Sequence, residues 1–186
     1  MRPSFFWKRH FPPGGLYPCG GPRRRHSPWP MNPALATLAL TLAAMTPADR
    51  EKAEFVVFTN CVATVESGLD YAAVGDRGAA VGAWQMHMVA WITANQYRKA
   101  NGMPTLSRAQ WKNQIVQRAM AMAYLSWCRE ELVKAGKSKP TPQEIYIMFA
   151  WGYGNLKDAG FDIEKAPKAK RDAAERVNNI YTDLIK

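Results

Sequence analysis

Apolar positions along this chain recur mostly with the spacing of a helix face, rather than with the alternation of a half-buried strand. The first clear case begins at Thr46-Pro47-Ala48-Asp49, where Thr46 is an N-cap candidate and Pro47 suits the first helical position. The segment that follows presents one apolar face, made of Phe55, Phe58, Val62 and Val65. Gly68 is a stop signal, so the pattern predicts a helix that ends at Glu66.

The next two predicted helices lie between residues 83 and 136. Residues 83–100 have helical spacing and end near Asn101-Gly102. Ser107-Arg108-Ala109-Gln110 has the form of a capping box, and we expect it to open a long helix that stops near Gly136. The apolar face expected of that helix consists of Trp111, Ile115, Ala119, Met122 and Leu125.

Two further helices complete the pattern. Thr141-Pro142-Gln143-Glu144 repeats the helix-start signal and leads into an apolar run that glycines 152 and 154 break. An amphipathic helix is predicted over roughly residues 167–185. Residues 68–82 hold four glycines and are predicted as a loop. The sequence has no convincing strand pattern, and the predicted fold class is all-α with one glycine-rich loop.

The first 45 residues differ in composition from the rest. Residues 1–30 are rich in Pro, Gly and Arg, which predicts a disordered basic extension. Residues 31–45 contain an apolar run that is too short to span a bilayer as a helix. We expect either a signal-peptide core, with Thr41-Leu42-Ala43 as a small-x-small cleavage pattern, or, if Met31 is the true start, an N-terminal apolar helix. Residues 46–186 then form one domain.

The composition and net charge indicate which kinds of molecule the protein binds. The chain has 186 residues, of which 47% are hydrophobic, and this fits one domain with a sizeable core. The net charge is +10, and the excess lies largely in residues 1–30. A basic balance suits an anionic polymer, such as bacterial cell wall or nucleic acid. We expect no nucleic-acid partner, because zinc-finger spacing, a heptad-bearing basic helix and an RNA-binding sheet signature are all absent from the sequence.

The three cysteines, Cys19, Cys61 and Cys128, are too few for a disulfide scaffold. Cys61 and Cys128 are expected to be small buried apolar residues on helices. If the protein is exported, the alternative is a single disulfide bond between them. The sequence has no Cys-x-x-Cys pair and no His/Cys cluster, so we expect no zinc site.

Candidate chemistry centres on Glu66-Ser67-Gly68, which is followed about fifteen residues later by Gly82-Ala83-Trp84-Gln85-Met86. A glutamate at a helix end is by itself most often a solvated surface charge. Here a glycine-punctuated loop follows it, and then a segment that carries an amide and a large aromatic ring. This combination indicates a lone catalytic carboxylate placed in a saccharide cleft.

These segments resemble the E-S-G … G-A-x-G-L-M-Q-I signature of soluble-lytic-transglycosylase-like domains, which share a lysozyme-like fold with goose-type lysozymes. The segment Phe149-Ala150-Trp151-Gly152-Tyr153-Gly154 resembles the family's third motif, an A-Y-N-A-G-like turn. The sequence around residues 73–78 is most similar to small phage-encoded members. The resemblance covers roughly residues 50–185, and it implies a lysozyme-like fold whose glycine-rich loop lies at the active site.

The resemblance implies roles for individual residues. Glu66 matches the family's catalytic acid/base, Gln85 matches the glutamine that faces the cleft, and Trp151 takes the place of the third motif's aromatic. The residues expected to position substrate are Ser67, Trp84, Gln85, Trp151 and Tyr153. The chain departs from the family at Gly152, where the family has an asparagine, and this removes one polar contact with the substrate.

The activity implied by the resemblance is lytic cleavage of peptidoglycan at the β-1,4 bond between N-acetylmuramic acid and N-acetylglucosamine. Glu66 would protonate the leaving oxygen and then, as a carboxylate, deprotonate the muramic acid C6 hydroxyl, which leaves a 1,6-anhydro end. No metal and no organic cofactor is implied. We expect a monomer without a stable membrane span, whose partner is the glycan strand and whose place is a phage virion or the periplasm and envelope of a bacterium.

Two alternatives stay open. A second carboxylate that orients water, Asp76 or Asp70, would make the domain a lysozyme-type hydrolase. Acids in a glycine-rich loop are more often turn formers or surface charges, and Asp76 beside Arg77 equally fits a loop ion pair. Gly152 supports the other alternative, a non-catalytic wall-binding or virion structural module that keeps the fold.

Overall fold

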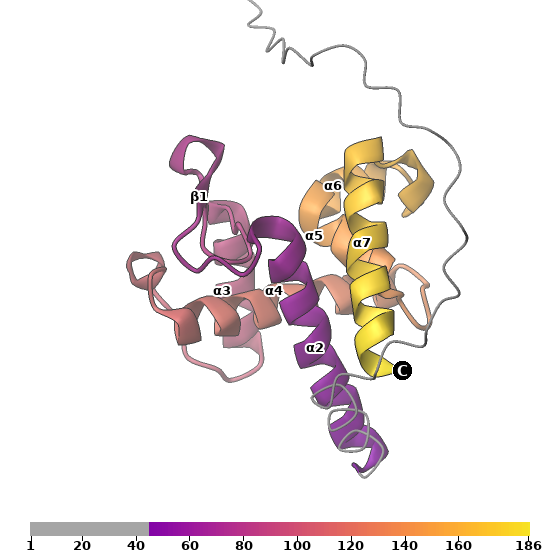
Figure 1. Cartoon of the computed structure of the whole chain (residues 1–186), viewed down its shortest axis with the longest axis horizontal. Helices are drawn as coiled ribbons and strands as arrows, with labels where there is room; N and C mark the ends of the chain where they lie inside the picture. The colour runs from indigo at the N-terminus through magenta and orange to yellow at the C-terminus, as the bar shows by residue number, and fades with distance from the viewer. Residues whose placement is uncertain (1–44) are drawn as a thin grey trace, which may run out of the picture. The chain divides into compact units, whose positions relative to one another are not determined.

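The computed structural model describes residues 45–186, which form α-helices and one small hairpin (Figure 1). The helices are α2 (Pro47–Ser67), α3 (Met88–Ala100), α4 (Gln114–Lys134), α5 (Pro142–Trp151), α6 (Tyr153–Asp158) and α7 (Lys168–Ile185). The hairpin consists of β1 (Val74–Gly75) and β2 (Ala80–Val81). The predicted all-α class is confirmed in that the described chain is mostly helical. The expectations for residues 1–30 and for the apolar segment 31–45 lie, apart from Met45, outside the described residues.

Helix α2 begins and ends where the local sequence signals predict. The Thr46 hydroxyl accepts a hydrogen bond from the backbone N–H of Asp49 at 3.2 Å. Gly68 has a φ of 69°, the left-handed conformation that ends a helix and that glycine adopts without strain. The buried face of α2 packs along α7 (Figure 1). The ring of Phe58 meets that of Tyr181 edge-on, with the centroids 6.0 Å apart. In this helix the capping residues set the two ends, and the apolar face sets the side that packs against the core.

Helix α5 is apolar on all sides from Ile145 to Trp151, and it packs against both α4 and α7. Both hydrogen bonds of its predicted capping box form: Glu144 N–H donates to the Thr141 hydroxyl at 3.2 Å, and Thr141 N–H donates to the Glu144 carboxylate at 2.8 Å. Ile147 and Met148 are fully buried. Because a helix that is apolar all round needs neighbours on every side, α5 forms the centre of the core.

The predicted loop over residues 68–82 contains a strand pair that the sequence pattern did not indicate. Val74 pairs with Val81 and Gly75 pairs with Ala80 in an antiparallel register. Strands of two residues are too short to show a hydrophobic alternation, so only the pairing itself reveals them.

The start of α3 also differs from its prediction. Residues 83–87 are not helical, because Gln85 has a φ of 46° and Met86 pairs with Val81 in an isolated antiparallel bridge. The helix begins only at Met88. The apolar spacing of these five residues favours a helix, but the bridge between Met86 and Val81 holds them in a non-helical conformation.

Helix α4 begins later than predicted and turns a different face to the core. Ser107 caps only a single 3₁₀ turn, and α4 starts after Asn113, whose Oδ1 accepts the backbone N–H of Ile115 at 2.9 Å. Ile115, expected in the core, is 80% exposed, whereas Leu125 is buried as expected. The buried face also includes Val116, Gln117, Met120, Tyr124, Cys128 and Leu132.

The two cysteines of the described chain are buried and unbridged. Cys61 lies in α2 and Cys128 in α4, and both are free thiols. Burial raises the pKa of Cys61 to about 11, and it raises the pKa of Cys128 well above its usual value. Both behave as small apolar residues of the core, as expected.

A buried amide joins the hairpin loop to α4. Gln117 is 3% exposed, and its Oε1 accepts the backbone N–H of Ala83 at 2.8 Å. Its Nε2 donates to the carbonyl oxygens of Tyr71 at 2.8 Å and of Trp111 at 2.6 Å. Gly82, with a φ of 76°, lies directly against the same amide group. One side chain of α4 thus holds the segment before β1 and the segment after β2.

Replacing Gly82 by alanine should therefore destabilise the fold strongly. The new Cβ would collide with the Gln117 amide, at a φ that alanine disfavours. We expect a loss of about 3 kcal/mol or more in the free energy of unfolding. Gly78→Ala is the matched control, because Gly78 also has a positive φ but has open space around it, and it should cost only about 1–2 kcal/mol. Equal losses for the two variants in urea unfolding would contradict the role of Gln117.

Candidate active site

Glu66 lies in the last turn of α2, two residues before the glycine that ends the helix. Its side chain is half-buried, and its Oε1 accepts a hydrogen bond from the Tyr146 hydroxyl at 2.7 Å. Among residues 45–186, the other carboxylate oxygen takes part in no intramolecular hydrogen bond. The structure thus fixes one oxygen of the predicted catalytic carboxylate and leaves the second available to a ligand.

Tyr146 is a site residue that the sequence analysis missed. It lies in the middle of α5 and is 2% exposed. Burial, reinforced by the negative charge of Glu66, raises the pKa of Tyr146 far above its ordinary value. The phenol therefore stays protonated at neutral pH and remains a hydrogen-bond donor to Glu66. Its only signal in the sequence is a polar hydroxyl within an otherwise apolar helix, since a buried tyrosine usually finds a partner.

Ser67 connects the end of α2 to the loop instead of facing a ligand. Its hydroxyl donates to the Ala83 carbonyl at 2.8 Å and accepts the backbone N–H of Asp70 at 3.1 Å. Both bonds are internal, and they fix the position of the residues around Glu66.

Trp84 is a core residue, and its burial does not fit the expected contact with a sugar ring. It is 1% exposed, and its Nε1 donates to the Thr59 carbonyl at 2.7 Å. The ring of Tyr71 covers it edge-on, with the centroids 5.9 Å apart. The indole N–H is satisfied by α2, so the ring packs inward and ties the loop to that helix.

Gln85 lies in the turn after β2, between Val81 and its bridge partner Met86. Its Nε2 donates to the Gly82 carbonyl at 2.8 Å, and its Oε1 lies against Gly75. The side chain is half-buried, so it is held by the loop and yet partly accessible. The residue that resembles the family's cleft glutamine is thus locked to the backbone of the glycine-rich segment.

Trp151 and Tyr153 flank the junction between α5 and α6, and both are half-buried. Gly152, between them, has φ 94° and ψ 149°, a conformation that is essentially restricted to glycine. An asparagine at this position would therefore be strained.

A run of aromatic rings links this junction to the donor of Glu66. Tyr146 stacks with Phe149 at 6.3 Å, and Phe149 contacts Tyr124 at 5.6 Å. Tyr124 stacks on Trp127 at 5.5 Å, and Trp127 contacts Tyr153 at 5.6 Å. The structure therefore connects Tyr153 to Tyr146 through packed rings that span α4, α5 and α6.

The two loop acids, Asp70 and Asp76, have separate partners. The Oδ1 of Asp70 accepts the backbone N–H of Ala72 at 2.8 Å, which makes Asp70 a turn former. Asp76 pairs with the Nε2 of His87 at 2.8 Å, and not with Arg77, and its side chain is 69% exposed. The hairpin loop and the start of α3 are thus joined by an exposed contact between these two side chains.

Comparisons with known proteins add no relative to this picture. No protein-family model, no curated protein and no solved structure matches the chain. Within residues 45–186, no helix is long and apolar enough to cross a membrane, and no three His, Cys, Asp or Glu side chains are grouped to hold a metal ion. The functional assignment rests on the residues and on their geometry.

The buried phenol predicts a specific alkaline response. In the folded protein Tyr146 keeps its proton above pH 10, whereas the unfolded chain loses it there, so stability falls as the pH rises above about 10. Tyr146→Phe should cost about 1–2 kcal/mol at pH 7 through the lost bond to Glu66. It should also make the decline above pH 10 shallower by about 1.4 kcal/mol per pH unit. Urea unfolding from pH 7 to 11.5 checks both; curves that stay parallel would contradict the buried, protonated phenol.

Proposed function

We propose that residues 46–186 form a lysozyme-like lytic transglycosylase domain that cleaves the β-1,4 bond between N-acetylmuramic acid and N-acetylglucosamine in peptidoglycan. The observation that carries the proposal is Glu66, held through one oxygen by Tyr146 at the rim of a glycine-rich loop. A carboxyl group fixed in this way has one defined orientation, and general acid–base catalysis requires such a fixed geometry. The sequence resemblance of the same loop supports the substrate class.

In the first half of the reaction, the protonated Glu66 gives its proton to the glycosidic oxygen while the C1–O bond breaks. In the second half, the Glu66 carboxylate takes the proton of the C6 hydroxyl, and the C6 oxygen bonds to C1. The product carries a 1,6-anhydro ring, no water is consumed, and Glu66 returns to its protonated form. Because one residue serves as acid and then as base, a single well-positioned carboxylate suffices, whereas hydrolysis usually requires two.

The protein's contribution is mainly positional. Tyr146 holds the carboxylate from the core side, and Ser67 and Gln117 hold the loop that follows it. Gln85 is the polar group of this loop that we propose to meet the substrate, and the half-buried rings of Trp151 and Tyr153 would stack on sugar faces. We leave Trp84 out of the proposed contacts because it is buried.

The setting we propose is local opening of the bacterial wall, by a phage particle or by an enzyme exported to the envelope. The lysozyme-type hydrolase remains the second candidate, because Asp76 lies exposed on the same hairpin and its partner is only a histidine. In that case the products would carry reducing ends. A wall-binding module without catalysis would release no fragments at all.

Replacing Glu66 by glutamine should abolish turnover and leave binding intact. The amide keeps the shape and can still accept the Tyr146 hydrogen bond, but it cannot donate or take up a proton. We expect a fall of at least about 100-fold in the release of soluble fragments from purified peptidoglycan by the full chain, with co-sedimentation unchanged. Asp76→Asn is the control: it should retain activity in a transglycosylase and lose activity in a hydrolase. Full activity of Glu66→Gln would show that the site is wrongly assigned.

A further inference from the structure

The positive charge of residues 45–186 is concentrated in one stretch. Residues 68–118, which run from the hairpin through α3 to the start of α4, hold six Lys and Arg side chains but only two acidic ones. In the rest of residues 45–186 the two signs are equal in number. The cations are Arg77, Arg98, Lys99, Arg108, Lys112 and Arg118, and the acids are Asp70 and Asp76. A local excess of positive charge favours an anionic ligand.

The tip of the hairpin, within this stretch, has a strained backbone. Asp76, Arg77 and Gly78 follow one another with positive φ values of 47°, 56° and 94°. Glycine adopts this conformation freely, whereas in other residues the Cβ crowds the following carbonyl oxygen. Arginine also lacks the short polar side chain with which aspartate or asparagine can bond the local backbone. The arginine at position 77 therefore carries a conformational cost that a glycine would not.

Neighbouring residues hold the tip in this shape. Asp76 Oδ2 lies 2.8 Å from the Nε2 of His87, and Arg108 Nη2 donates to the Ala79 carbonyl at 2.8 Å. The Arg77 side chain is exposed, and it forms no hydrogen bond or ion pair with any of residues 45–186. Its own contacts within the described chain thus do not offset the strain. Strain of this kind is concentrated at sites that bind or act on a ligand.

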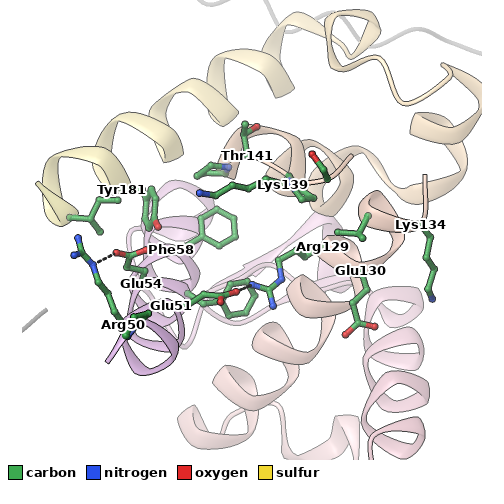
Figure 2. Close-up of a pocket in the computed structure, with 17 residues that line it drawn as sticks. Arg50, Glu51, Glu54, Phe58, Arg129, Glu130, Lys134, Lys139, Thr141 and Tyr181 are labelled. Carbon is green, nitrogen blue, oxygen red and sulfur yellow. Dashed lines mark hydrogen bonds and ion pairs between the residues drawn. The ribbon is translucent and has the colours of Figure 1, made fainter. Parts of the chain in front are cut away.

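Two guanidinium groups at the far end of α2 show the contrast. Arg50 and Arg129 line a hollow of about 970 Å³ beside the N-terminal half of α2 (Figure 2). Arg50 Nε lies 2.8 Å from the carboxylate of Glu54. Arg129 Nη1 lies 2.9 Å from the carboxylate of Glu51. Both arginines thus have an acidic partner within the fold, whereas the donors of Arg77 stay available to a ligand.

The hairpin tip lies beside the candidate active site. Gln85, the polar group that we propose to meet the substrate, has its Oε1 against Gly75, the residue before Asp76. In Figure 1 the hairpin and the α5–α6 pair lie on opposite sides of the C-terminal end of α2, where Glu66 is located. A glycan strand held at Glu66 and Gln85 would thus bring the groups that branch from it to Arg77.

We propose that Arg77 binds a carboxylate of the peptide that branches from muramic acid, so that the domain prefers peptide-bearing wall to bare glycan. This role rests on the proposed function, in which the glycan strand passes Glu66. A guanidinium offers a planar fork of donors that can bond both oxygens of one carboxylate. The surplus of cations in residues 68–118 attracts the same acidic peptide.

Binding to two forms of the wall tests this role. The first is peptidoglycan freed of phosphate-containing polymers, and the second is the same material after carbodiimide and ammonia have converted its carboxyl groups to amides. Both are insoluble, so co-sedimentation measures the Kd, and the full chain carries Glu66→Gln so that neither is digested. Arg77→Gln should weaken binding to the first at least about threefold and leave binding to the second unchanged.

Lys99→Gln is the matched control, because it removes one exposed charge from the same basic stretch. Lys99 lies in the last turn of α3, about 18 Å along the helix from His87, and its loss should leave binding to both walls unchanged. Equal effects of Arg77→Gln on the two walls, or no effect on either, would overturn the proposal. A loss in Lys99→Gln as large as that in Arg77→Gln would also overturn it, by showing general charge attraction.

Replacing Arg77 by glycine separates recognition from folding. Glycine removes the backbone strain, so the melting temperature should stay equal or rise by a few degrees, while binding to the native wall weakens as in Arg77→Gln. A clear fall in melting temperature would show that the side chain supports the fold and would contradict its role in recognition.

Fragment release by the unmodified chain is measured separately. Release without an effect of Arg77→Gln on binding would overturn only the role of Arg77. An effect of Arg77→Gln without any release would overturn only the proposed lytic function.

Discussion

The Gln117 amide is the interaction on which the arrangement of the site depends. It is almost fully buried in α4 and bonds three backbone groups that lie before and after the hairpin. A buried amide without partners would be costly, whereas one with all its partners holds its neighbours in a single geometry. The close approach of Gly82 shows how tightly the loop is fitted around this side chain.

Two further hydrogen bonds join the loop to α2. Trp84 Nε1 donates to the Thr59 carbonyl, and the Ser67 hydroxyl donates to the Ala83 carbonyl. The loop is thereby fixed to the helix that carries Glu66, while Tyr146 reaches the same carboxylate from α5. The candidate catalytic group thus lies where three parts of the core meet.

The parts of the fold that depend on local chemistry could be predicted from the sequence. Thr46, Gly68 and the capping box at Thr141 mark helix ends through bonds to residues only a few positions away. Features set by distant contacts could not be predicted. Tyr146 meets Glu66 across 80 positions, and the later start of α4 changes which residues face the core. Glu66 could be chosen as the candidate from the sequence because a helix end and a glycine-rich loop are local signals. The burial of Trp84 could not be predicted in this way, because it depends on contacts with distant parts of the core.

The product of the reaction tests the central claim most directly. Purified peptidoglycan would be digested with the full chain, and the soluble fragments would be analysed by mass spectrometry. The account predicts fragments that are lighter by one water than hydrolysis products and that end in 1,6-anhydromuramic acid, because the C6 hydroxyl and not water attacks the anomeric carbon. Fragments with reducing ends, or no fragments from a folded protein that still binds the wall, would contradict it.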